Sequence, residues 1–319
     1  MTDYIIGMWM YRNGGGEVIQ QRIIKQLNQN GIAVINNLSL KNGYANNGHI
    51  FSGEVDMANL DLYFSYNASE QSDYQVYLYQ ALNMTVPCIN SFEAFCVSED
   101  KFKTSHLLNQ NGIPTANYQL CHHQELERAR EILRNWGGKA LFKPTNGWGG
   151  KGIINIESAA EFERLLPLLN ETKPGYFYLE RWIDNDFTDF RVDVVDGTIV
   201  GCYGRKAAQG DWRTNISCGG SIILREINDQ IASISLRAAR LTGLDIAGVD
   251  LIYDREREQF VVLEVNGIPA FATPEQEKFG LDFNTRKIDK IVNLIKRKVK
   301  FNSNSIGNIH EQALAKYIA

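Results

Sequence analysis

Residues 142–152 read FKPTNGWGGKG, in which four glycines and two lysines surround one tryptophan. The run 140–142 is apolar, and the segment 152–156 has the branched residues typical of a strand. We therefore expect a loop that joins two strands. Glycine lets backbone N–H groups approach an anion closely, and lysine adds positive charge, so the stretch predicts a phosphate-binding loop. An ordinary glycine-rich hairpin is the alternative interpretation.

Three familiar phosphate-binding motifs fit this stretch poorly. A P-loop needs glycine, four residues, glycine, lysine and then serine or threonine, but position 145 is Thr and position 152 is Gly. The string 147–152 formally matches G-x-G-x-x-G, but a dinucleotide fingerprint must open a helix, and this string leads into the strand-like IINIE. A protein-kinase loop needs later H-R-D and D-F-G motifs, which the sequence lacks.

Two acids and an amide occupy strand-like segments nearer the C-terminus. Asp250 lies in IAGVDLIYD, and Glu264 and Asn266 lie in FVVLEVN. Residues two apart on a strand share a face, and a short turn makes the segments a hairpin that brings Asp250 beside the other two. Buried acids need compensation, and such oxygen ligands suit Mg²⁺ that holds substrate phosphates. An exposed hairpin face is the alternative, against which the flanking Val and Leu residues argue.

A basic segment, GRKAAQGDWRTN, follows another strand-like run. Its Arg205, Lys206 and Arg213 suit carboxylates and transferring phosphoryl groups, because guanidinium groups bind both kinds of anion. Ordinary surface charge is the alternative for each of these residues.

Length and composition indicate a globular protein of two or three subdomains. The chain has 319 residues, 44% hydrophobic and 22% charged, with a net charge of −4. This charge argues against a nucleic-acid partner, and no apolar run is long enough to cross a membrane. The N-terminus lacks the features of a secretory signal, and the five cysteines are scattered, so we expect a cytoplasmic protein. The pair at 122–123, His-His, has no metal-site partners and favours a plain loop or helix start.

The remaining pattern predicts an α/β chain. A strand at 4–10, a glycine turn at 13–16, a helix up to Gly31 and a strand at 32–35 begin an open α/β layer. The glycine turn opens a helix and is either an anion site or a tight connection. Ser98 is the expected N-cap of a helix that carries Lys101. Strands at 190–195, 198–203, 246–253 and 259–265 and a basic amphipathic helix at 285–299 follow later.

Taken in order, these motifs resemble the ATP-grasp superfamily and, within it, the RimK-like amino-acid ligases. The matching strings run from DKFKTSHLLNQNGIPT to VLEVNGIP, across about Ser98–Pro269. The resemblance implies an ATP-grasp fold of the α/β (α+β) class in three parts. These are an N-terminal open α/β domain at 1–97, a small central lid subdomain at 98–183 and an antiparallel β-rich subdomain at 184–300, before a tail at 301–319.

The resemblance also implies the site residues. Arg213 and Asn215 match residues near the γ-phosphate and the acyl intermediate. Asp250, Glu264 and Asn266 match the ligands of two Mg²⁺ ions, with Glu264 between the ions and Mn²⁺ as an alternative metal. The residues implied to bind ATP are Lys101, Lys143, Gly147, Trp148, Gly149, Gly150, Lys151, Gly152, Glu180, Arg181, Trp182, Ile183, Asp189, Arg205 and Lys206.

The implied activity is ATP-dependent ligation of a carboxylate to an amine through an acyl phosphate, with release of ADP and phosphate. A small molecule or a peptide supplies the reacting groups, and homo-oligomers are common in the family. The run 267–271, GIPAF, replaces small polar residues that glutamate-adding members often carry, which leaves the acceptor open. A phosphotransferase and a non-catalytic nucleotide-binding module are the alternatives. The presence of all the expected metal ligands and basic residues argues against a non-catalytic module.

Overall fold

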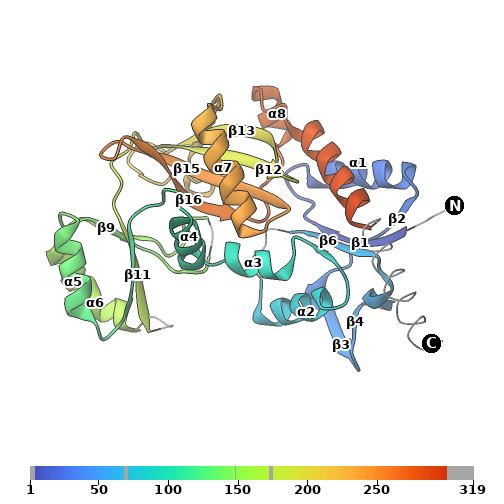
Figure 1. Cartoon of the computed structure of the whole chain (residues 1–319), viewed down its shortest axis with the longest axis horizontal. Helices are drawn as coiled ribbons and strands as arrows, with labels where there is room; N and C mark the ends of the chain where they lie inside the picture. Colours follow the sequence, from blue (N-terminus) through green and yellow to red (C-terminus); the bar gives the residue numbers. More distant parts are fainter. Residues whose placement is uncertain (1–3, 68–70, 148, 172–174, 300–319) are drawn as a thin grey trace, which may run out of the picture.

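The structure is a computed structural model that describes residues 4–67, 71–147, 149–171 and 175–299 (Figure 1). Two predictions, Trp148 as an ATP-binding residue and a tail at 301–319, concern residues that lie outside the described ranges. Figure 1 shows an N-terminal part at the right, a large antiparallel sheet in the middle and a smaller layered part at the left. This arrangement agrees with the ATP-grasp architecture that the resemblance implies.

The N-terminal part is a parallel sheet of order β2-β1-β6-β7. It begins with the predicted strand–turn–helix–strand unit, since β1 (Tyr4–Met10), α1 (Gly16–Gln29) and β2 (Ile32–Asn36) follow one another. The amides of Gly16 and Glu17, and those of residues 18 and 19, bond to carbonyls within residues 12–15. These four N–H groups are therefore engaged within the turn, as in a tight connection between strand and helix.

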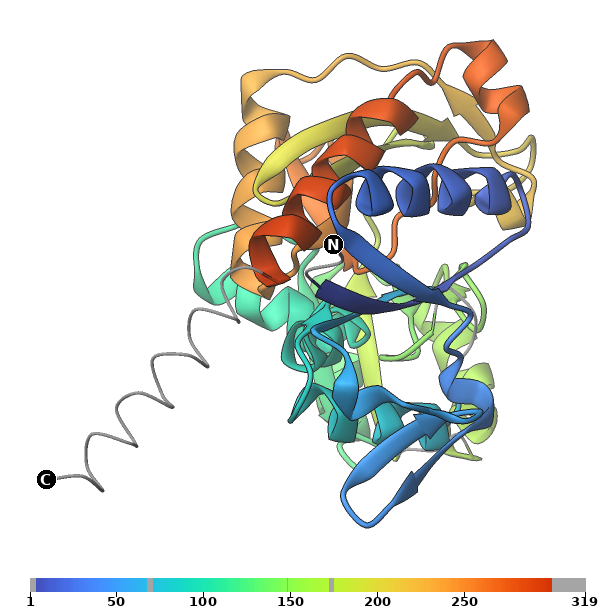
Figure 2. The same cartoon turned by 90° about the vertical axis from the view of Figure 1, so that its right-hand side faces the viewer.

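The sheet is completed by β6 (Leu62–Tyr66) and β7 (Cys88–Ile89), with α2 (Asp73–Asn83) between them. A small antiparallel sheet between β2 and β6 was not expected from the sequence. It consists of β3 (Gly43–Asn46), β4 (His49–Ser52) and β5 (Val55–Asp56), and it projects from the rest of the fold (Figures 1 and 2). Its strands are too short and too rich in Asn and Gly to give a clear alternating pattern.

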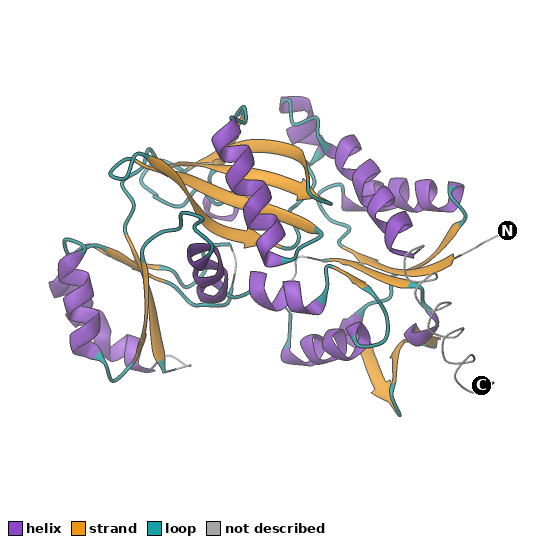
Figure 3. Cartoon of the chain, in the orientation of Figure 1, coloured by secondary structure: helices purple, strands orange, loops and turns teal. Residues whose placement is uncertain are grey.

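The lid is an antiparallel sheet of order β10-β9-β11-β8 with two helices beside it (Figure 3). Its elements are β8 (Tyr118–His122), α5 (Leu126–Asn135), β9 (Ala140–Phe142), β10 (Ile154–Ile156), α6 (Ala159–Glu171) and β11 (Tyr176–Arg181). Ile154 pairs with Phe142, so the glycine-rich stretch joins neighbouring antiparallel strands, as predicted. The lid has a hydrophobic core of its own, which includes Phe162 and Phe177.

The largest sheet is antiparallel, of order β14-β13-β12-β15-β16. Its strands are β12 (Thr188–Val195), β13 (Thr198–Lys206), β14 (Ser221–Ile223), β15 (Ile246–Asp254) and β16 (Gln259–Asn266). One face is apolar and packs against α7 (Asp229–Thr242), for example through Val192, Val249 and Ala238. The alternate residues of these strands point to the other face, which is where the charged side chains lie.

The remaining helices join the parts together. α3 (Phe92–Ser98) and α4 (Lys101–Gln110) pack on the large sheet and α7, and α8 (Pro274–Phe279) precedes a helix at 284–299. The prediction of Ser98 as N-cap is wrong: Asp100 caps α4 by accepting from the amide of Lys103, because Ser98 closes α3 instead. None of the helices within the described ranges combines the length and apolarity needed to cross a bilayer.

The hydrophobic cores do not follow the three expected ranges. One core joins Ile6 and Ile23 of the N-terminal part to Val195 and to Ile291 of the helix at 284–299. That helix lies beside α1 in both views, and Arg22 Nη2 donates to Thr285 Oγ1 at 2.8 Å (Figures 1 and 2). The N-terminal part and the large sheet therefore form one packed unit, whereas the lid packs on itself.

Candidate active site

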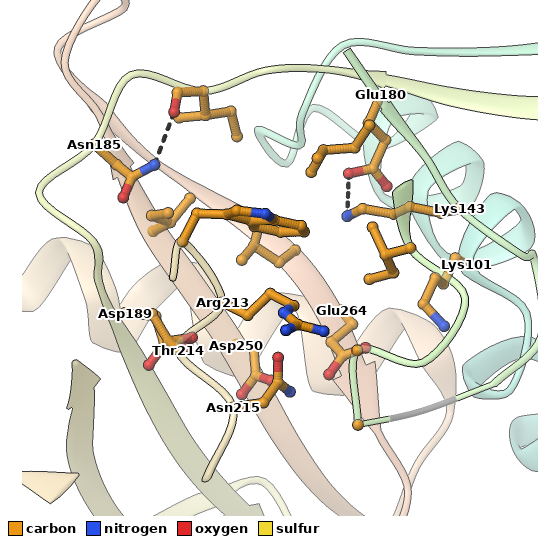
Figure 4. A pocket seen from close by; sticks show the side chains of 18 of the residues that line it. Lys101, Lys143, Glu180, Asn185, Asp189, Arg213, Thr214, Asn215, Asp250 and Glu264 are labelled. Carbon is orange, nitrogen blue, oxygen red and sulfur yellow. Dashed lines mark hydrogen bonds and ion pairs between the residues drawn. The ribbon is translucent and has the colours of Figure 1, made fainter. Parts of the chain in front are cut away.

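A cavity lies between the lid sheet and the charged face of the large sheet (Figure 4). Its wall contains residues from β9, β11, β12, β15 and β16 and from the loop that follows β13. One end is apolar. There the rings of Trp182 and Trp212 meet edge to face, with centroids 5.7 Å apart, beside Ile183 and Ile252. Such a slot suits a flat aromatic base.

A buried lysine links the lid strands next to this slot. Lys143 Nζ forms an ion pair with Glu180, and the Tyr178 hydroxyl donates to the other Glu180 oxygen at 2.9 Å. Lys143 and Glu180 are both buried, so each compensates the charge of the other. Glu180 lines the cavity, and its carboxylate is engaged within the protein.

The glycine-rich loop is fastened on two sides. Lys101 donates its amide to Thr145 O at 2.8 Å and its Nζ to Gly147 O, and burial lowers the pKa of the Lys101 ammonium group. On the other side, Ser217 Oγ donates to Gly149 O at 3.2 Å. Gly150 has φ of +74°, and a Cβ atom there would lie 3.2 Å from the Asn215 side-chain oxygen, so glycine is required.

Two acids meet on the charged face of the large sheet. Asp250 of β15 stands opposite Glu264 of β16, and a register shift beside this pair lets the consecutive residues Leu263 and Glu264 both line the cavity. Burial would raise the pKa of Asp250, but Arg191 and Arg205 hold it well below its usual value. Burial and the neighbouring Asp250 raise the pKa of Glu264.

Arginines surround this acidic pair. Arg191 binds Asp250 through Nε and Nη2, with Nη2 at 2.7 Å from Oδ2, and Arg205 Nη2 lies 2.9 Å from the same oxygen. Arg205 also binds Asp189 at 2.6 Å. Arg213 enters from the loop after β13, where Asp211 Oδ2 accepts from its Nη2 at 2.7 Å. Figure 4 shows Arg213, Asp250 and Glu264 in the same region of the cavity.

The acidic pair fits a divalent cation. Asp250 is buried and held by two arginines, whereas the partly buried Glu264 beside it forms no ion pair with a cation in the described part of the chain, so added positive charge would stabilise the pair. Asn266 adds an amide whose Nδ2 donates to Glu264 at 3.1 Å. Within the described ranges, no three His, Cys, Asp or Glu side chains are grouped as a metal site. An oxygen from Asn266 is therefore the natural third protein ligand, and oxygen ligands are those that Mg²⁺ prefers.

Most of the residues implied by the resemblance line this cavity, but some do not. Lys206 is exposed and is absent from the wall, because it follows the inward-pointing Arg205 on the same strand. Arg181 lines the cavity, but its guanidinium group is paired with Asp254 and Glu256. Asn266 lines a second cavity beyond Glu264. Gly152 is not part of the wall, and Trp148 lies outside the described residues.

Sequence reasoning missed several residues of the site. Arg191, which holds Asp250 and lines the second cavity beyond Glu264, lies in the strand DFRVDV, where charged residues alternate with apolar ones. That alternation of Asp189, Arg191 and Asp193 was a usable signal for a buried polar face. Trp212, Thr214 and Asn185 line the first cavity, and no pattern in the sequence distinguishes them.

The chain has relatives among known proteins. The family described as RimK-like ATP-grasp domain matches residues 98–291. The tetrahydromethanopterin:alpha-L-glutamate ligase of Methanocaldococcus jannaschii is 32% identical over 220 residues, which cover 66% of this chain and 72% of that protein. A probable alpha-L-glutamate ligase of Haemophilus influenzae is 29% identical over 204 residues, covering 64% of this chain and 66% of that protein.

Solved structures share the fold at low sequence identity. The ATP-grasp ligase PsnB, complexed with a minimal precursor, superposes with a TM-score of 0.66 at 17% identity, covering 92% of this chain and 99% of that one. The D-alanine–D-alanine ligase of Bacillus anthracis superposes with a TM-score of 0.64 at 15% identity, covering 95% of this chain and 99% of that one.

Proposed function

Since the chain belongs to the RimK-like ATP-grasp family and is therefore an ATP-dependent carboxylate–amine ligase, we propose that its reaction takes place at the wall formed by Asp250, Glu264 and Asn266. The carboxylate substrate attacks the γ-phosphate of ATP there and becomes an acyl phosphate. The amine of an amino acid or a peptide then attacks the acyl carbon, and phosphate leaves. The product is an amide.

The observation that carries this proposal is that one end of the cavity is apolar and the other end is lined by charged side chains. Its apolar end, with Trp182 and Trp212, suits the base of the nucleotide. The triphosphate then extends past Lys143 and Lys101 toward Glu264. A carboxylate and a triphosphate repel each other, so positive side chains must neutralise both before they approach. We assign this neutralisation to Arg213, which lines the same cavity as Lys143 and Glu264.

The glycine-rich loop closes the site in this proposal. Its backbone N–H groups at 147 and 149–152 cover the phosphates, and its contact with Ser217 joins it to the segment that carries Arg213 and Asn215. Closing the site excludes water, which would otherwise hydrolyse the acyl phosphate. We assign Arg213 and Asn215 to the stabilisation of the reacting phosphoryl and acyl groups.

Mg²⁺ accompanies ATP in this family, and we assign its ligands to Asp250, Glu264 and Asn266. When bound, the metal neutralises the phosphates and orients them for transfer. Two ions would be held by these three residues, with Glu264 as the shared ligand, and Mn²⁺ is an alternative with the same ligand preference. Arg191 and Arg205 hold Asp250 in place while the ligand set is assembled.

We place the reaction in the cytoplasm, because the five cysteines are all free. The relatives named as ligases of alpha-L-glutamate, and PsnB in complex with a precursor, point to an amino acid or a peptide as substrate. We also propose a homo-oligomer, because homo-oligomers are common in this family.

One screen tests the proposed function. The purified chain is incubated with ATP, Mg²⁺, hydroxylamine and single carboxylates drawn from the amino acids and short peptides. Hydroxylamine traps an acyl phosphate as a hydroxamate, which mass spectrometry detects alongside ADP. We expect a hydroxamate from at least one donor. A stable phosphorylated product would support a phosphotransferase instead, and ATP binding without ADP release would support a non-catalytic module.

A further inference from the structure

A second cavity, of about 280 Å³, opens on the other side of Glu264. It shares Gly149, Arg205, Asn215 and Glu264 with the nucleotide cavity, so the two spaces meet at the proposed reacting centre. Its outer wall comes from the N-terminal part and from the segment after β16. A group that reaches the acyl carbon without crossing the nucleotide must come from this side.

The arginine side chains that line the second cavity already form ion pairs with carboxylates of the protein. Arg191 and Arg205 line it, and they are held by Asp250 and by Asp189. Glu264 is a proposed metal ligand. Glu99, the residue that follows α3, differs from these residues because its charge is not compensated by a partner in the described part of the chain. Its side chain is exposed to the cavity, and its carboxylate has no hydrogen bond or ion pair with any residue in the described part of the chain.

The surroundings of Glu99 favour a cationic ligand. The charged groups that act on it are Lys101, which already donates to Gly147 O, and Glu264, which repels it. Asn67 and Gln71 line the same cavity, and neither side chain has a hydrogen bond to another described residue. An ammonium ion with polar groups around it would satisfy all three side chains.

We propose that Glu99 binds the acceptor amine as its ammonium ion and takes the proton that the amine loses before it attacks. This inference rests on the proposed function. The ammonium group gives one proton to the Glu99 carboxylate, and the neutral nitrogen forms a bond to the acyl carbon. The bond from that carbon to the phosphate oxygen breaks, and the phosphate leaves with the electron pair and accepts the second proton of the nitrogen. Glu99 then loses its proton to solvent through the open cavity.

An uncharged nucleophile can show whether Glu99 acts on the amine or on the earlier step that forms the acyl phosphate. Hydroxylamine is uncharged near neutral pH, so it needs neither the ion pair nor the proton acceptor. With a carboxylate donor found in the hydroxamate screen, amide formation is measured with amino acids and methylamine as acceptors. Hydroxamate formation is measured in parallel. The variants are Glu99→Gln, Glu99→Asp and Glu93→Gln, the last being an exposed glutamate in α3.

We expect Glu99→Gln to lower kcat/KM for the amine acceptors about 100-fold, as for loss of a general base. Hydroxamate formation and the KM for ATP should stay close to the wild-type values. Glu99→Asp should recover part of the amide activity, and Glu93→Gln should change neither. Unchanged amide formation in Glu99→Gln, or an equal loss of amide and hydroxamate, would overturn the role of Glu99. No hydroxamate from the wild type with any donor would overturn the proposed function itself.

Discussion

The Nζ atom of Lys287 lies 2.7 Å from Oδ2 of Asp193, and both side chains are fully buried. Lys287 also donates to the carbonyl oxygens of Pro269 at 2.7 Å and Ala270 at 3.0 Å. Burial lowers the pKa of its ammonium group. One buried cation thus ties the helix at 284–299 to the large sheet and to the segment that lines the second cavity.

Replacing Lys287 by methionine should destabilise the protein by about 3–5 kcal/mol, because Asp193 would remain buried without its counter-charge. The measurement is urea unfolding followed by circular dichroism. Lys290→Met, on the same helix and partly exposed, is the matched control and should change stability little. The double variant Lys287→Met/Asp193→Asn should regain part of the loss. A Lys287→Met protein as stable as the wild type would contradict this account.

Glu264→Ala should abolish turnover, because the proposed metals would lose the ligand that they share. Hydroxamate formation measures this without knowledge of the natural amine. Glu226→Ala removes an exposed glutamate that lines neither cavity and serves as the control. Activity retained in Glu264→Ala would remove this residue from the metal site.

Lys143→Ala should weaken ATP binding roughly 10–100-fold, the usual effect of losing a hydrogen bond to a charged group. Calorimetric titration with ATP and Mg²⁺ measures the dissociation constant. The substitution also leaves Glu180 buried without its cation, so Lys143→Ala/Glu180→Gln is needed as a second variant. If the double variant binds ATP as tightly as the wild type, Lys143 does not contact the nucleotide.

Arg213→Ala should lower kcat about 100- to 1000-fold and change the KM for ATP little, because the guanidinium group is expected to act on the developing charge. Steady-state ADP release at saturating ATP gives both constants. Arg240→Ala, at the exposed end of α7, is the control. An unchanged kcat in Arg213→Ala would show that this side chain is remote from the transferring group.

Mg²⁺ binding without nucleotide should tighten as the pH rises. Burial and Asp250 raise the pKa of Glu264 above the ordinary value of 4.5, and a protonated carboxyl group does not bind the metal. Affinity should therefore fall as the pH drops through this raised pKa, while Asp250 stays ionised. Calorimetry over a pH series checks the trend. The dependence should vanish in Glu264→Gln, and a flat profile in the wild type would contradict it.

Much of the fold was predictable because its patterns are local. The strand 4–10 and the hairpin of β15 and β16 appear almost as expected, since alternation and turn residues determine them. The cap of α4 was misplaced because Ser98 and Asp100 are both good N-cap residues, and the packing of α3 decides between them. The two buried ion pairs of Arg191 and Lys287 depend on tertiary contacts, which no spacing in the sequence encodes.

The candidate site was predictable to a similar extent. Alternation put Glu264 and Asn266 on one face of a strand, but it did not predict the register shift beside Glu264. The sequence also did not indicate which of Arg205 and Lys206 faces the cavity. Glu99 carried no signal at all. Its place opposite Glu264 arises because α3 and β16 come together in space, although many residues separate them in the chain.

The hydrophobic core that runs from Ile6 to Ile291 sets a limit on recombination between relatives. A chimera that takes its first part from another ligase would cut through that core and join two surfaces that never packed together. An exchanged lid, which keeps Phe162 and Phe177 in a core of its own, breaks far fewer such contacts. New acceptor preferences are therefore expected to arise by point changes along the second cavity, and new nucleotide preferences by exchange of the lid.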